Sequence, residues 1–108
     1  MINARFKEKC GNIVSVKLSG HAEASNDGYD MVCSAVSAIS ITIANGITEI
    51  IKVNPEIELK DGFLSLDLNN LSESDLNNCQ ILLKTMLLGL KNIEVNYSEY
   101  INVEIEEV

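Results

Sequence analysis

The spacing of apolar residues changes period several times along this chain, and this change limits the fold more than any other feature. From residue 2 to 18 apolar and polar residues alternate, with Cys10-Gly11-Asn12 as a turn between two runs. Alternation is typical of strands with one buried face, so this segment predicts a β-hairpin. From residue 27 or 28 to about Lys52 the apolar residues instead recur every three or four positions, which predicts a helix. Its predicted buried stripe is Val32, Val36, Ile39, Ile43, Ile47 and Ile50.

A second hairpin and a second helix are predicted in the second half of the chain. Residues 56–68 form two alternating runs around Asp61-Gly62, the strongest short hairpin signal in the sequence. Ser72 has the residue type that caps a helix N-terminus, and Asp75 stands at the position of a capping-box acid. Leucines at helical spacing then continue this helix to about Asn92.

The last apolar run predicts one long strand. Odd-numbered positions from Ile93 to Ile105 are mostly apolar, and Glu99 interrupts them, which indicates a bend or bulge there. The predicted order of elements is therefore ββαββαβ. Two amphipathic helices can cover one face of a single mixed, mostly antiparallel sheet. We therefore expect one α+β domain over residues 1–108.

The composition limits the core and the partners. Hydrophobic residues make up 46% of the 108 residues but aromatic residues only 5%, so the core must be aliphatic, and surplus Ile and Leu suggest an oligomer. The formal net charge of −8 argues against direct contact with nucleic acid, whose phosphates are bound by clustered Lys and Arg. The acidity permits attraction to a basic protein, although keeping the domain soluble is the simpler explanation.

The three cysteines, Cys10, Cys33 and Cys79, form no CxxC pair, so a disulfide framework is disfavoured and a reducing compartment fits better. No pair of ligands among these cysteines and His21 has the spacing of a zinc site, so we expect neither a metal nor another cofactor. We see no signal-peptide core and no run of about 20 apolar residues, so we expect a cytoplasmic protein without a membrane span.

The segment 20–37 holds the residues that could carry chemistry. His21 is the only histidine, and it stands twelve residues before Cys33 with a small, polar loop between them. A thiol becomes a good nucleophile when it ionises, which a neighbouring imidazole or the N-terminus of a helix favours. At helical spacing, Asp30, Cys33 and Ser37 share a strip beside the buried stripe. This strip continues through small residues, which leaves space for a ligand.

Each of these residues also has a purely structural explanation. A free cysteine is often a small buried hydrophobe, and a lone loop histidine is often only solvated. Asp30 could interact favourably with the helix dipole in the first turn, and Ser37 could hydrogen-bond to the helix backbone. The residues alone therefore leave catalysis and structure open.

The pattern G-H-A, a short loop of small residues, and G-Y-D-x-V-C-x-A-V-S resembles the motif of the Prp family of ribosomal-processing cysteine proteases. The resemblance implies that His21 is the catalytic base and Cys33 the nucleophile. It further implies that Asp30 is an acid close to this dyad, while Gly20 and Ser37 match other characteristic positions.

The resemblance also implies a substrate and an assembly. Members of the Prp family remove the N-terminal extension of a large-subunit ribosomal protein. By this resemblance the extension would here be bound in extended form and cleaved after an aromatic residue. Members form homodimers and have a mobile loop between the second strand and the first helix. One departure is Ser34, where Ala is commoner in the family.

The expected mechanism is acyl transfer through Cys33, with His21 moving the protons and helix-start N–H groups as possible oxyanion donors. We expect substrate to close the loop that carries His21, with Gly28 as its hinge. Two other classes stay open at this point. One is a non-catalytic, ribosome-associated binding module, and the other is a thiol redox protein in which Cys10 or Cys79 resolves Cys33.

Overall fold

The computed structural model describes residues 1–20 and 27–108, and it confirms the α+β class and the predicted order ββαββαβ. In chain order the elements are β1 (Ile2–Lys9), β2 (Asn12–Ser19), α1 (Asp27–Asn45), the π-helical turn η1 (Gly46–Ile51), β3 (Glu56–Lys60), β4 (Phe63–Asp67), α2 (Glu73–Asn96) and β5 (Ile101–Glu107). Both hairpins form where they were predicted. Ser72 caps α2 as expected, because its hydroxyl accepts the Asp75 N–H at 3.1 Å.

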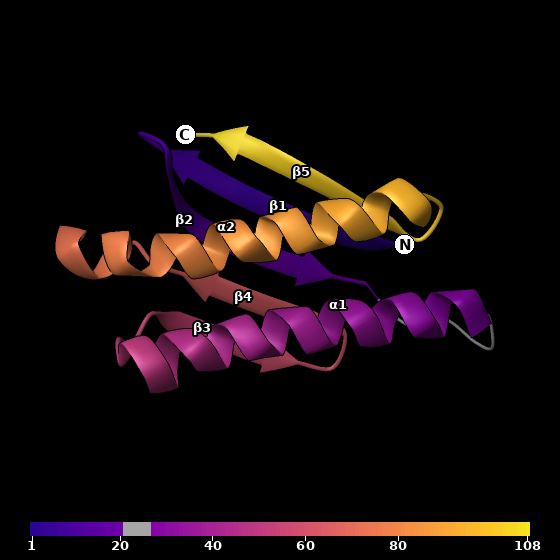
Figure 1. Ribbon diagram of the computed structural model, residues 1–108, viewed down its shortest axis with the longest axis horizontal. Coiled ribbons are helices and arrows are strands. Elements are labelled where there is room, and N and C mark those ends of the chain that lie inside the picture. The colour runs from indigo at the N-terminus through magenta and orange to yellow at the C-terminus, as the bar shows by residue number, and fades with distance from the viewer. Residues whose placement is uncertain (21–26) are drawn as a thin grey trace.

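The strands form one sheet in the order β3-β4-β2-β1-β5, and only the β1–β5 pair is parallel (Figure 1). The β1–β2 turn consists of Cys10 (φ 52°) and Gly11 (φ 80°). Two consecutive residues with positive φ give the turn whose twist matches that of a hairpin. This turn lies at the end of β2 opposite to Gly20, so Cys10 and Gly20 are separated by the length of the strand.

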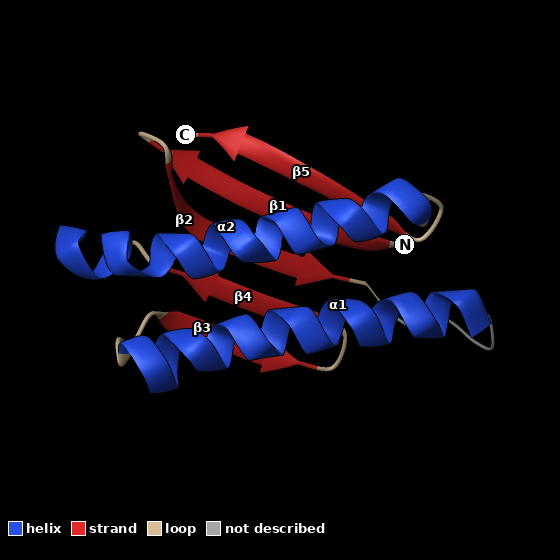
Figure 2. Ribbon diagram, in the orientation of Figure 1, coloured by secondary structure: helices blue, strands red, loops and turns tan. Residues whose placement is uncertain are grey.

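Both helices lie on the same face of the sheet, α1 over β3 and β4 and α2 over β1 and β2 (Figures 1 and 2). The buried core between them is mainly aliphatic, as the composition predicted. Its fully buried large side chains include Phe6, Ile13, Val16, Ile47, Leu66, Leu83 and Leu90. The edge strand β3 is only partly covered, since Ile57 and Leu59 remain 40% and 60% exposed. The uncovered strip beside α1 is where the candidate site forms.

The prediction of one long last strand is wrong. Helix α2 continues through Asn96, and β5 begins only at Ile101. Ile93 fits the helical spacing as well as the strand alternation, and the Tyr97 N–H donates to the Ile93 carbonyl at 2.9 Å. The interruption at Glu99 is therefore the turn between helix and strand rather than a bulge.

The first helix ends as predicted, with Lys52 in the left-handed conformation (φ 64°), but Ile50 is not buried. It is 79% exposed, whereas Ile47 is fully buried. The π-helical turn changes the rotation per residue, so the helical spacing that predicted Ile50 no longer applies there.

By length and composition the segment Gly28–Ile51 could cross a membrane, with a mean hydropathy of 1.6, so the expectation that no such stretch exists was wrong. This is weak evidence for a span, because a helix that covers a sheet passes the same test. In this structure the segment packs on the sheet through Val32, Val36 and Ile47.

Candidate active site

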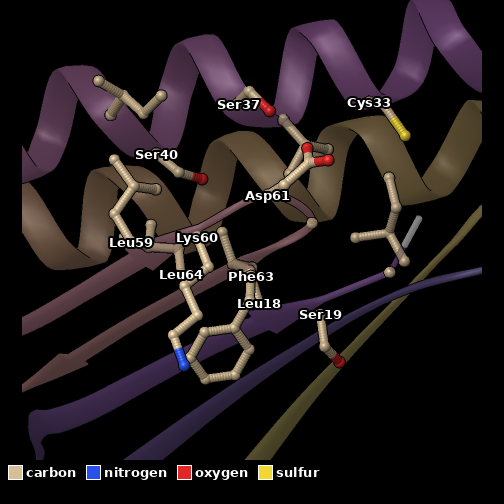
Figure 3. A pocket seen from close by; sticks show the side chains of 15 residues that line it. Leu18, Ser19, Cys33, Ser37, Ser40, Leu59, Lys60, Asp61, Phe63 and Leu64 are labelled. Atoms are coloured by element: carbon tan, nitrogen blue, oxygen red, sulfur yellow. The ribbon is translucent and has the colours of Figure 1, made fainter. Parts of the chain in front are cut away.

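The Cys33 side chain lies at a cavity of about 180 Å³ between α1, the end of β2 and the β3–β4 hairpin (Figure 3). The apolar walls include Leu18, Val36, Leu59, Phe63 and Leu64. The polar lining includes Cys33, Ser37, Ser40 and Asp61. In Figure 3 the Cys33 thiol and the Ser37 and Ser40 hydroxyls point from α1 toward the strands. The small-residue strip predicted on this helix therefore does border an open space.

The structure brings together three of the predicted site residues. Gly20, Cys33 and Ser37 all line this cavity. Asp30 is exposed and does not line it, but its charge acts on the Cys33 thiol. His21 lies outside the described residues, so the proximity of the dyad stays a prediction.

Gly20 is placed at the point where β2 leads toward His21. Its φ is +147°, and a Cβ there would lie 2.7 Å from the Met1 carbonyl oxygen and 2.8 Å from the Ile2 Cα. The Gly20 N–H also donates to the Gly62 carbonyl at 3.0 Å. A side chain would collide with the backbone of the neighbouring strand, so this position requires glycine. Gly20 thus fixes where the chain leaves the sheet beside the cavity.

Gly28 lies in the first turn of α1 and packs against Tyr100. A Cβ at Gly28 would lie 2.9 Å from the Tyr100 hydroxyl oxygen. The Tyr100 ring in turn meets the Tyr29 ring edge-on, with centroids 6.0 Å apart and an interplanar angle of 79°. Close packing therefore accounts for this glycine, and its action as a loop hinge stays a prediction.

The surroundings of Cys33 raise the pKa of its thiol above the ordinary value. Burial is the largest cause, and the negative charge of Asp30 also raises the pKa. A side-chain hydrogen bond with Tyr29 and the positive charge of the N-terminal amine lower it. Cys33 also lies six residues after Asp27, about 9 Å along the axis, whereas the helix dipole acts within the first turn. The helix N-terminus therefore contributes less to ionisation than the sequence suggested, and the main activation must come from another group.

The sequence did not predict a role for Asp61 in the site. The pattern Asp61-Gly62 predicted only a turn, yet Asp61 lines the same cavity as Cys33 and Ser37 (Figure 3). This neighbourhood depends on the strand order, in which β4 pairs with β2 and carries β3 to the edge under α1. No spacing within the sequence encodes that order.

The other two cysteines are poorly placed to react with Cys33. Cys79 is fully buried in α2, and Cys10 is exposed in the turn at the far end of β2. The eight residues of β2 separate that turn from Gly20 by about 25 Å, whereas a disulfide needs Cα atoms within about 7 Å. In the part of the chain that the structure describes, no three metal-ligating side chains cluster.

The fold and the site together define a small α+β thiol enzyme, in which a cysteine on the first helix lines a cavity with apolar walls and several polar groups. Residues 1–102 match the family described as cysteine protease Prp, so the chain belongs to this family of cysteine proteases. The resemblance of segment 20–37 to this family is thereby confirmed.

Known relatives agree in sequence and in structure. The ribosomal processing cysteine protease Prp of Staphylococcus aureus is 32% identical over 98 residues, which cover 86% of this chain and 87% of the relative. The crystal structure of SMU.848 from Streptococcus mutans has a TM-score of 0.86 at 31% identity, with 100% of this chain and 96% of that chain covered. The S. aureus protease in complex with a substrate peptide also has a TM-score of 0.86, at 27% identity and with 98% and 100% covered. The S. aureus protease has also been solved with a covalently linked product peptide, with a TM-score of 0.83, 28% identity and the same coverage.

Proposed function

We propose that this protein removes the N-terminal extension of a large-subunit ribosomal protein, with Cys33 as the nucleophile and His21 as the general base and acid. The observation that carries this proposal is the Cys33 thiol at the end of a cavity able to hold part of a peptide. The S. aureus relative supports it, since that protease is described with a substrate peptide and with a covalently linked product.

The reaction proceeds by acyl transfer. His21 takes the thiol proton, and the Cys33 thiolate attacks the carbonyl carbon of the scissile peptide bond. The C–N bond then breaks as the imidazolium of His21 gives its proton to the leaving amine, which leaves a thioester on Cys33. A water that loses a proton to His21 attacks this thioester and releases the new C-terminal carboxylate and the thiol.

The developing oxyanion needs donors other than the helix around Cys33. Cys33 lies within α1, where backbone N–H groups point to the carbonyls one turn back and are already bonded. The donors therefore come from N–H groups outside this helical turn, including any that the bound peptide brings into place.

Asp30 acts through the histidine in this mechanism. Its negative charge raises the pKa of Cys33, so it opposes the thiolate rather than supporting it. A carboxylate near an imidazole favours the charged imidazolium form. Asp30 would therefore stabilise the imidazolium of the thiolate–imidazolium pair, although it destabilises the thiolate. A carboxylate at this position could orient His21 or bind the substrate backbone, and the effect on the imidazolium favours the first role.

We further propose that the protein is a cytoplasmic homodimer that does not bind nucleic acid directly. Ile81, Leu88 and Val95 on α2 are 80%, 62% and 80% exposed. Their spacing of seven residues places them on one line of the helix, which suits packing against the same helix of a second copy. Sedimentation of wild type and Leu88→Glu tests this, since a wild-type monomer would contradict it.

The direct test of the function is cleavage of a peptide that carries the ribosomal extension, followed by mass spectrometry of the products. The wild-type protein and a Cys10→Ser control should release the extension at one bond, while Cys33→Ser and His21→Ala should not. Continued cleavage by Cys33→Ser would refute the assignment of the nucleophile. The redox alternative predicts an intramolecular disulfide after mild peroxide, which the positions of Cys10 and Cys79 disfavour.

A further inference from the structure

The Ser40 hydroxyl is a buried polar group that the mechanism does not use. Ser40 is 1% exposed, and its hydroxyl has no hydrogen-bond partner among the residues that the structure describes. Buried polar groups are nearly always paired, because an unpaired one destabilises the folded state. Ser40 lines the same cavity as Cys33. A ligand in this cavity would give the hydroxyl a partner that the described residues do not supply.

The position of Ser40 along α1 relates it to the scissile bond. Ser40 comes seven residues after Cys33, so the two lie about two turns, or about 10 Å, apart along the helix axis. An extended peptide advances about 3.3 Å per residue. A peptide that runs along the cavity from Cys33 therefore brings a side chain two or three positions from the scissile bond to Ser40.

The size and lining of the cavity define the side chain that fits. Its volume is about 180 Å³, and an apolar cavity of about 150 Å³ in another protein holds benzene. Leu18, Val36 and Leu64 supply apolar walls. The charged amine of Lys60 forms an ion pair with Glu58 at 2.7 Å, so we do not count it as a binding group of the cavity. The space near Ser40 thus suits an apolar stem with an uncharged polar tip.

We propose that Ser40 determines specificity: the cavity accepts a substrate side chain two or three positions from the scissile bond, and Ser40 hydrogen-bonds to an amide or hydroxyl at its tip. The inference rests on the proposed function, since Cys33 marks the scissile bond. A hydroxyl both donates and accepts, so glutamine and tyrosine satisfy it, whereas methionine and phenylalanine fill the same space and leave it unpaired. A site built around such a group discriminates against the analogue that lacks it.

Matched peptides test this directly. The kcat/KM values are compared for peptides that carry Gln or Met, and Tyr or Phe, at each of the three positions on either side of the scissile bond. Wild type should prefer the polar member of a pair by about fivefold at the second or third position on one side. The Ser40→Ala variant should lose this preference. Thr42→Ala is the control, because it removes a hydroxyl from the exposed side of the same helix.

Binding separates this inference from the proposed function. The affinities of the same peptides are measured by calorimetry for Cys33→Ala and for Cys33→Ala/Ser40→Ala. A polar preference that depends on Ser40 supports the inference even where no peptide is cleaved, in which case the protease assignment alone fails. Equal Gln/Met and Tyr/Phe ratios with and without Ser40 at every position, or no binding of any peptide, would overturn it. Ser40→Cys, which exchanges the hydroxyl for a slightly larger thiol that hydrogen-bonds only weakly, is used instead if Ser40→Ala does not fold.

Discussion

Replacing Gly20 by alanine tests how the site is held. The substituted Cβ would lie 2.7 Å from the Met1 carbonyl oxygen and 2.8 Å from the Ile2 Cα, and the φ of +147° is one that side chains rarely adopt. An alanine held at this φ destabilises the folded state by about 1–3 kcal/mol. Relief of the collision costs about 1–3 kcal/mol more, because the Ile2 N–H is bonded to the Tyr100 carbonyl at 2.8 Å and the strand cannot easily move. The expected loss in the free energy of unfolding is about 2–6 kcal/mol, against a typical total of about 5–15 kcal/mol.

Urea denaturation measures this loss, and Gly11→Ala is the matched control. Gly11 also has a positive φ of +80°, but a Cβ there would meet nothing within 4 Å. The control should therefore lose only the conformational part, about 1–2 kcal/mol. It should also keep the wild-type kcat/KM, because the β1–β2 turn is at the far end of β2 from the cavity.

Gly20→Ala should lower kcat/KM beyond its loss of folded protein, because the backbone shift displaces the segment that leads to His21. Activity is therefore measured at a temperature where circular dichroism shows both variants folded. If Gly20→Ala were no less stable than Gly11→Ala and fully active, the packing argument for Gly20 would be refuted.

Three further predictions concern stability. Ser40→Ala should raise the free energy of unfolding, measured in urea, by about 1 kcal/mol, because it removes a buried hydroxyl that has no partner in the described structure. A lower stability of this variant would show that the hydroxyl is hydrogen-bonded in the free protein. Burial raises the pKa of the Cys79 thiol, so the folded state holds this proton more tightly than the unfolded state does. Stability should therefore be constant below the ordinary thiol pKa of about 8.5 and fall as the pH rises above it, and Cys79→Ala should reduce this slope in urea titrations at pH 7 to 10. Gln80→Met should lower the free energy of unfolding by about 2 kcal/mol, because the Gln80 amide accepts the Ile13 N–H at 2.6 Å and donates to the Ile13 carbonyl at 3.0 Å. A loss below about 0.5 kcal/mol in urea would contradict the importance of these two hydrogen bonds.

The sequence predicted those parts of the fold that depend on local periodicity. Both hairpins, both helices and the cap at Ser72 follow from spacing and residue type within a short segment. The two errors in secondary structure and burial arose where the assumed periodicity did not decide the outcome. Ile93 fits a helix and a strand equally well, and only packing decides between them, while the π-helical turn shifts Ile50 out of a stripe that assumes constant rotation.

The site was predictable to the extent that it lies on one helix. Cys33 and Ser37 share a face because of helical geometry, and the small residues beside them indicated a space. Asp61 reaches this space only through the order of strands in the sheet, which no local pattern contains. The pKa of Cys33 likewise depends on its burial and on Tyr29 and Asp30 together, so the activation that the thiol needs could not be predicted from local spacing.

The central claim is that His21 activates the thiol of Cys33, and the dependence of kcat/KM on pH for cleavage of the extension peptide tests it most directly. Wild type should be active near neutral pH. His21→Ala should be about 10²–10⁴-fold slower there, and its residual rate should keep rising with pH because the surroundings hold the pKa of the unassisted thiol high. A His21→Ala variant with the wild-type rate and pH profile would contradict the account.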